Sequence, residues 1–218
     1  MPVWFDDLST VVTAAPGTGS TSLVSACSGA PGACDLLDGV ELGDDGIDRK
    51  HATMAQVSAV AAVAARPRPD VVVTTTRNPF DFYVAEWHRT RTRWAAEVGD
   101  EGSWVNTLAG MRERIAIAVE LDFDSWLRHE LADDLSRPGA RRRLNRGHVT
   151  EATVVVRMER MDDDLRRLHP ELSQRIGPVP HVNRTQRDRP YWRHYSPWGH
   201  DAVARLHAED IARYDYRF

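Results

Sequence analysis

Lysine is almost absent from this chain. Of the 28 basic residues, 27 are arginine and only Lys50 is lysine. A bias toward arginine, alanine, valine and aspartate is typical of a GC-rich genome and explains why lysine is scarce. It does not explain why the single lysine stands beside His51. A histidine can accept a proton near neutral pH and an ammonium group can offset negative charge, so this pair is a candidate for catalysis.

Cysteine and long apolar runs are also scarce. Cys27 and Cys34 are the only cysteines; we expect free thiols in a reducing compartment, with a disulfide as the alternative. No cysteine–histidine spacing indicates a metal site. The longest apolar run, residues 57–65, is too short to span a bilayer, and the first ten residues lack the pattern of a signal peptide. We therefore expect a cytoplasmic protein with no metal and no membrane contact.

The net charge of −4 gives no general attraction to nucleic acid, and we expect no nucleic-acid partner. The exception is "RPGARRRLNR" at residues 137–146, which holds five arginines. This run fits either a solvated loop or a surface for an anionic ligand or substrate.

Three β-branched segments, residues 9–15, 70–76 and 152–159, have the composition of buried strands. Each precedes a segment with helical character, and further helices are expected at residues 51–66, 104–135 and 197–214. This alternation predicts an α/β protein with a three-layer, P-loop-like fold, in which helices flank a central parallel sheet. No repeat or long linker divides the chain, so we expect a single domain over residues 1–218.

The stretch "APGTGSTSL", residues 15–23, places small residues between the first of these strands and the helix that follows. The first amides of a helix and its dipole attract anions, and glycines let the backbone wrap around a phosphate. The alternative is an ordinary capped turn. The lysine of a nucleoside-triphosphate loop is missing. The predicted cofactor-binding residues of this loop are Pro16, Gly17, Thr18, Gly19, Ser20, Thr21 and Ser22.

A second anion-binding feature is Arg77, which follows the strand at residues 70–76. Ligands of open parallel sheets bind at the carboxyl ends of the strands. Anion sites at the ends of two buried strands suit a ligand that carries phosphate groups at both ends.

Five segments in sequence order resemble the sulfotransferases that use 3′-phosphoadenosine 5′-phosphosulfate (PAPS), in particular bacterial relatives of the carbohydrate sulfotransferases. They are "PGTGSTSL", "RKHAT", "RNPFDFYVAEWH", "VVVRMERMDDDL" and the C-terminal stretch from "PHVNRTQRDRPYWRHYSPWGH" onward. The resemblance spans residues 10–218 and is weakest over residues 95–150. It implies transfer of a sulfuryl group from PAPS, as donor co-substrate, to a hydroxyl or amine of a carbohydrate or small natural-product acceptor.

The resemblance also implies roles for individual residues. The loop at residues 15–23 would hold the 5′-phosphosulfate and Arg77 the 3′-phosphate. A C-terminal loop would close over the nucleotide with Asn183, Arg184, Arg187 and Arg189. Two positions depart from the family pattern: Gly17 stands where a lysine or arginine is usual, and Ala85 where a serine is usual.

Sulfuryl transfer needs a cation near the oxygen that bridges sulfur and phosphate, and a base near the acceptor. We expect Lys50 to supply the charge that is missing at Gly17, and His51 to be the base, with Glu41 as the alternative base. The two departures favour a second hypothesis, a catalytically impaired nucleotide-binding protein. A third, a small-metabolite kinase, is disfavoured because the phosphate-loop lysine is missing.

Overall fold

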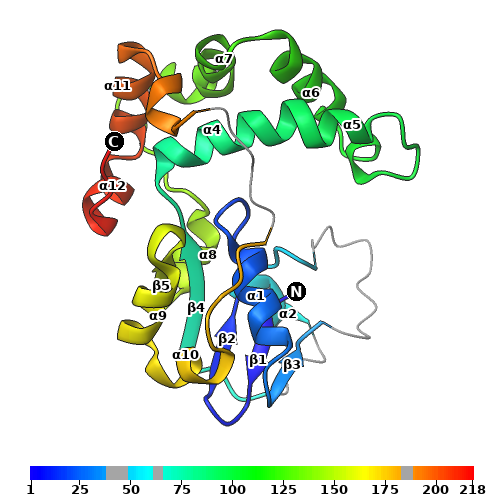
Figure 1. Cartoon of the computed structure of the whole chain (residues 1–218), viewed down its shortest axis with the longest axis vertical. Coiled ribbons are helices and arrows are strands. Elements are labelled where there is room, and N and C mark those ends of the chain that lie inside the picture. The colour runs from blue at the N-terminus through cyan, green and yellow to red at the C-terminus, as the bar shows by residue number, and fades with distance from the viewer. Residues whose placement is uncertain (38–48, 61–65, 183–188) are drawn as a thin grey trace. The chain divides into compact units, whose positions relative to one another are not determined.

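The computed structural model describes residues 1–37, 49–60, 66–182 and 189–218. The chain forms two compact units (Figure 1). Unit 1 comprises residues 1–77 and 144–184, and unit 2 comprises residues 78–143 and 185–218. The expectation of a single domain stays a prediction.

Unit 1 contains a five-stranded mixed sheet in the order β3-β1-β2-β4-β5. The strands β2, β4 and β5 are parallel, whereas β1 pairs antiparallel with both β2 and β3. The α/β class is thus confirmed, and the prediction of a purely parallel sheet is wrong. The reason is that the chain turns back directly after β1, so that β1 and β2 form a hairpin. The strands are β1 (Val3–Phe5), β2 (Thr10–Val12), β3 (Ala33–Asp35), β4 (Val71–Thr76) and β5 (Val154–Arg157).

Helices cover both faces of this sheet. On one face Val12, Val73 and Val156 pack against apolar side chains of α1, α9 and α10. On the other face Trp4 and Val11 pack with α2. Successive side chains of a strand point to opposite faces, so Val11 and Val12 belong to different layers. The helices of unit 1 are α1 (Ser20–Ser28), α2 (Met54–Ala59), α8 (Arg146–Glu151), α9 (Met161–Leu168) and α10 (Pro170–Ile176).

The helix α2 begins three residues later than the pattern predicts, at Met54 rather than His51. Thr53 and Gln56 form a capping box, in which the Thr53 hydroxyl accepts from the Gln56 amide at 3.3 Å and the Gln56 side chain accepts from the Thr53 amide at 2.9 Å. The helix therefore starts after Thr53, and His51 lies in the segment before it. Residues 61–65 of the predicted helix lie outside the described residues.

Unit 2 is helical and is built around a core that includes Tyr83, Trp87, Trp126, Leu127 and Val203. The helix expected near Pro79 and those expected over residues 104–135 and 197–214 are confirmed. A π-helical turn, Thr90–Trp94, extends the first helix. The helices are α4 (Pro79–Arg89), α5 (Ala95–Glu97), α6 (Met111–Glu120), α7 (Phe123–Leu135), α11 (Pro197–Leu206) and α12 (Ala208–Tyr214), with 3₁₀ turns at Trp104–Asn106 and Tyr191–His194.

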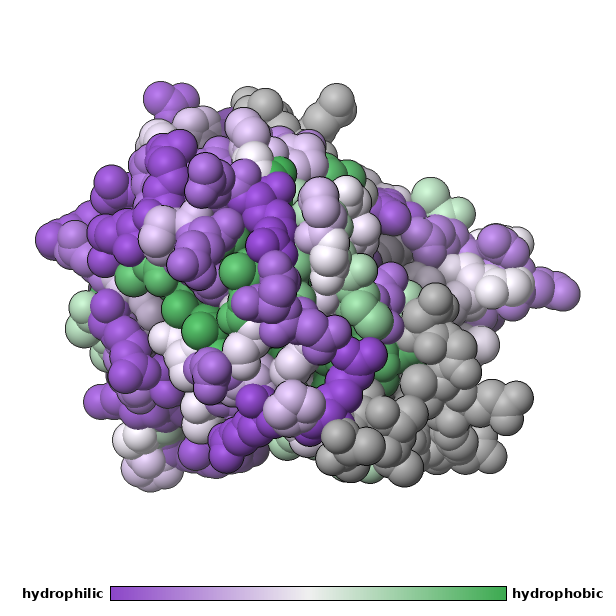
Figure 2. Space-filling model, turned by 90° about the horizontal axis from the view of Figure 1, so that it is seen from below, coloured by the Kyte–Doolittle hydropathy of each residue, from purple (hydrophilic) through white to green (hydrophobic). Residues whose placement is uncertain are grey.

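Figure 2 shows one face of the molecule, on which hydrophilic residues surround small groups of apolar residues. Among the described helices, none has both the length and the apolar composition that crossing a membrane requires.

Both cysteines are free thiols, and burial raises the pKa of Cys27 to about 12. Cys27 is thus a packing residue on the buried side of α1 rather than a reactive thiol.

Candidate functional site

The loop between β2 and α1 has a backbone that only glycine adopts easily. Gly17 and Gly19 have φ angles of 75° and 74°. A Cβ on Gly19 would lie 2.6 Å from Cγ of Met158, so no side chain fits there. Gly19 is also the N-cap residue of α1, and within the described part of the chain no side chain caps the helix. The first amides of α1 therefore lie at the positive end of the helix without a side-chain acceptor, as an anion-binding loop requires.

The hydroxyl groups of the loop serve mainly to shape it. Thr18 and Ser20 are buried, and their hydroxyls donate to the carbonyl oxygen of Ala15 at 2.8 and 2.7 Å. Thr18 Oγ1 is also 2.5 Å from Thr75 Oγ1 on β4. Ser22 Oγ accepts from the amide of Val182 at 3.0 Å. The backbone amides, more than these hydroxyls, are thus the donors that the loop offers to an anion; Thr21 is half-buried and Pro16 is exposed.

Arg77 lies against this loop. The residue follows β4 and is 7% exposed, and its Nη1 donates to the carbonyl oxygen of Gly17 at 3.1 Å. The sequence-predicted loop and the strand-end arginine are therefore brought together within unit 1. The result is a buried guanidinium beside a loop of backbone donors, a combination suited to phosphate and sulfate groups.

His51 reaches the segment that leads into the loop. The ring is half-buried, and its Nδ1 lies 2.6 Å from the carbonyl oxygen of Ala14. A carbonyl oxygen only accepts, so Nδ1 carries the hydrogen, and Nε2 of the neutral ring is the atom that can accept a proton. Lys50, the preceding residue, is exposed.

A second strand-end arginine has a different role. Arg157, at the end of β5, donates to Asp164 from Nε at 2.8 Å, from Nη2 at 2.7 Å and from its backbone amide at 3.0 Å. Burial alone would raise the pKa of Asp164, but the hydrogen bonds and charge of Arg157 outweigh burial and hold this pKa below its usual value. The pair fastens the first turns of α9 to the edge of the sheet.

Two residues near the loop are absent from the sequence predictions. Asn145 Nδ2 donates to the carbonyl oxygen of Pro16 at 2.9 Å, and His148 Nδ1 lies 3.3 Å from Thr13 Oγ1. Both belong to the short segment around α8, whose six helical residues carry no motif. Only tertiary structure brings them to the site.

Several predicted residues are not placed at this site. Glu41, Asn183, Arg184 and Arg187 lie outside the described residues. Arg189 is exposed and belongs to unit 2, and Ala85 is buried within α4. Their predicted roles stay predictions.

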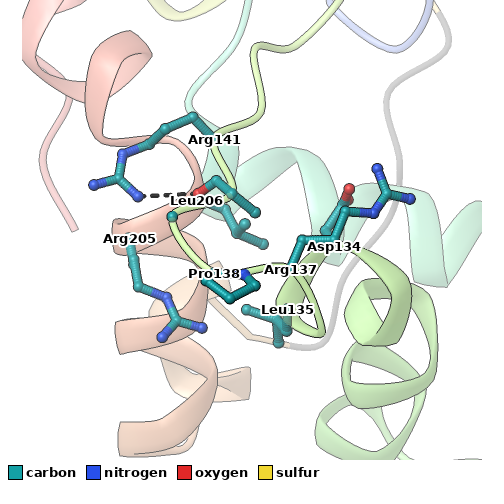
Figure 3. A pocket seen from close by; sticks show the side chains of 9 residues that line it. Asp134, Leu135, Arg137, Pro138, Arg141, Arg205 and Leu206 are labelled. Carbon is teal, nitrogen blue, oxygen red and sulfur yellow. Dashed lines mark hydrogen bonds between the residues drawn. The ribbon is translucent and has the colours of Figure 1, made fainter.

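The arginine run divides into two groups. Arg142 bonds to Asp134 at 3.1 Å, and Arg143 lies 3.4 Å from both Asp210 and Glu209, so these two arginines tie elements of unit 2 together. Others line a small pocket of about 100 Å³. Figure 3 shows that their guanidinium groups point in different directions, so they do not converge on one anion position. The arginines that line the pocket are Arg137 and Arg141 of the run, together with Arg205 of α11.

No protein-family model, no curated protein and no solved structure matches this chain. Within the described residues, no group of three histidine, cysteine or carboxylate side chains is placed to hold a metal ion. The features that bear on function are therefore the geometry of the loop, Arg77 and His51, together with the resemblance of the sequence motifs.

Proposed function

We propose that this protein is a sulfotransferase with a P-loop-like fold, which transfers a sulfuryl group from PAPS to a hydroxyl or amine of a carbohydrate or small natural-product acceptor. The observation that carries the proposal is the loop before α1, which lacks a side-chain cap and has the buried guanidinium of Arg77 bonded to Gly17. Backbone donors for one anionic group and a guanidinium for another suit a nucleotide that is phosphorylated at both ends.

The proposed reaction is an in-line displacement. The acceptor hydroxyl gives its proton to Nε2 of His51 while its oxygen forms a bond to sulfur. The bond between sulfur and the 5′-phosphate oxygen breaks, and 3′-phosphoadenosine 5′-phosphate (PAP) leaves with the electron pair. The loop amides and Lys50 offset the charge that develops on the leaving oxygen. The Nδ1 bond from His51 to Ala14 supports this role, because it directs the basic nitrogen away from the backbone.

One observation favours a second candidate, a nucleotide-binding protein without turnover. Gly17 provides no cation inside the loop, where charge would stabilise the leaving group most directly. Such a protein would bind PAP as tightly as the enzyme does but would transfer nothing.

The nucleotide assignment is tested with Arg77→Ala. We expect this change to weaken PAP binding by roughly 10- to 150-fold, as for the loss of one charge-assisted contact, and to leave binding of adenosine 5′-phosphate almost unchanged. Isothermal titration calorimetry of both nucleotides measures the difference. The matched control is Arg160→Ala, which removes an exposed arginine of the same unit.

Two results would contradict the assignment of Arg77 to the 3′-phosphate. Wild-type affinity for both nucleotides in Arg77→Ala would mean that Arg77 contacts neither. An equal loss for both nucleotides would mean that Arg77 acts only by holding Gly17 in place.

A further inference from the structure

The short helix α8 contacts the phosphate-binding loop. Asn145, its N-cap residue, donates to the carbonyl oxygen of Pro16 at 2.9 Å. One turn later, His148 is 5% exposed, and its Nδ1 lies 3.3 Å from the hydroxyl of Thr13 at the end of β2. These bonds hold the chain on both sides of Ala14 and Ala15.

The same helix also contacts the segment that carries His51. His148 forms a hydrogen bond with the backbone of His51. A Cβ on Gly147 would lie 3.0 Å from Cγ2 of Thr53, so the Thr53 side chain packs closely against the backbone of Gly147. Glu151 Oε1 accepts from the amide of Ala55 at 3.1 Å. The helix α8 thus contacts residues 51–55 along its whole length.

The protonation state of His148 suits a structural donor. Burial lowers the pKa of its imidazole; the hydrogen bond with the His51 backbone opposes this, and the charge of a protonated His51 adds to it. The ring is therefore neutral near pH 7. Its hydrogen-bond partners are the backbone of His51 and the hydroxyl of Thr13. A neutral neighbour also adds no charge that would oppose proton transfer to His51.

We propose that His148 is a positioning residue for His51, an inference that depends on the proposed function. The bond to Ala14 fixes the ring of His51 at one atom. The helix that carries His148 contacts Thr53 and the amide of Ala55, and so holds the backbone just after His51. Because the imidazole of His148 also bonds to Thr13 ahead of the loop, it sets the spacing between the proton acceptor and the bound phosphosulfate. Small errors in such spacing are costly in displacement reactions.

The test compares His148→Leu with His148→Gln. Leucine removes both hydrogen bonds, and we expect kcat for sulfuryl transfer from PAPS to fall by roughly 10- to 100-fold, with PAP affinity within about twofold of wild type. Glutamine keeps an N–H donor, and we expect it to restore most of kcat. The matched control is His169→Leu, a buried histidine bonded to Thr10 at the opposite end of β2 at 2.9 Å. We expect this control to lose stability but to keep kcat.

A second readout needs no turnover. Nitrogen NMR of the imidazole rings should show His51 with its hydrogen on Nδ1 in the wild type, and a mixture of tautomers in His148→Leu. The positioning role is overturned if the His51 tautomer is unchanged in His148→Leu and kcat is also unchanged. It is equally overturned if the tautomer is unchanged and His169→Leu lowers kcat as much as His148→Leu does. If the wild type transfers no sulfuryl group to any acceptor while the tautomer shifts as expected, the proposed function fails and the positioning of His51 by His148 stands.

Discussion

We expect His51→Ala to lower kcat for the proposed sulfuryl transfer by roughly 10²- to 10⁴-fold, the range for the loss of a positioned general base. The structure gives the reason: Nδ1 bonds to the carbonyl oxygen of Ala14, which makes Nε2 the proton acceptor. Steady-state assays with radiolabelled PAPS and a panel of sugar and phenol acceptors measure this effect.

The control for this experiment is His129→Ala, which removes an exposed histidine on α7. His129→Ala should keep the wild-type kcat. Wild-type kcat in His51→Ala would contradict the assignment and leave Glu41, outside the described residues, as the alternative base.

Lys50→Ala is the second substitution for which we expect a large loss of kcat. We expect kcat to fall by roughly 10²- to 10³-fold, as for the loss of one preorganised group that stabilises developing charge, with little change in PAP affinity. The reason is that Gly17 provides no charge to the bridging oxygen, whereas the only lysine of the chain directly precedes His51. Single-turnover transfer and calorimetry separate the effect on chemistry from the effect on binding.

Arg49→Ala is the matched control for Lys50→Ala, because it removes the exposed cation one residue earlier. It should change kcat little. Full activity in Lys50→Ala would show that the charge comes from elsewhere, and the arginines of the C-terminal loop would be the next candidates.

The sequence predicts the parallel strands of the sheet in unit 1 but not the antiparallel strands. The strands β2, β4 and β5 are runs of β-branched residues, and such runs are distinctive. All of β2 and nearly all of β4 are buried, whereas β5 is half-buried apart from Val156. The strands β1 and β3 have three residues each, too few to show a period. Their pairing decides whether the sheet is parallel or mixed, and pairing depends on the hairpin rather than on strand composition.

The site is predicted to a similar degree. The glycines, the strand-end Arg77 and the pair Lys50–His51 are visible because each belongs to a local pattern. The hydrogen-bond partners of the loop are not visible in the sequence. The conformation of the turn decides whether the hydroxyls of Thr18 and Ser20 face a ligand or the carbonyl oxygen of Ala15. His148 reaches His51 only because β4 and β5 pair, and no local pattern reports a contact so distant in the chain.

Nucleotide selectivity of the wild-type protein tests the central claim most directly. In calorimetric titrations, PAP, adenosine 5′-phosphate and ATP with magnesium are compared under one buffer condition. The account predicts that PAP binds at least about tenfold more tightly than either of the other two, since only PAP offers a phosphate at each end for the loop and for Arg77. Tighter binding of ATP with magnesium, or equal binding of PAP and adenosine 5′-phosphate, would contradict it.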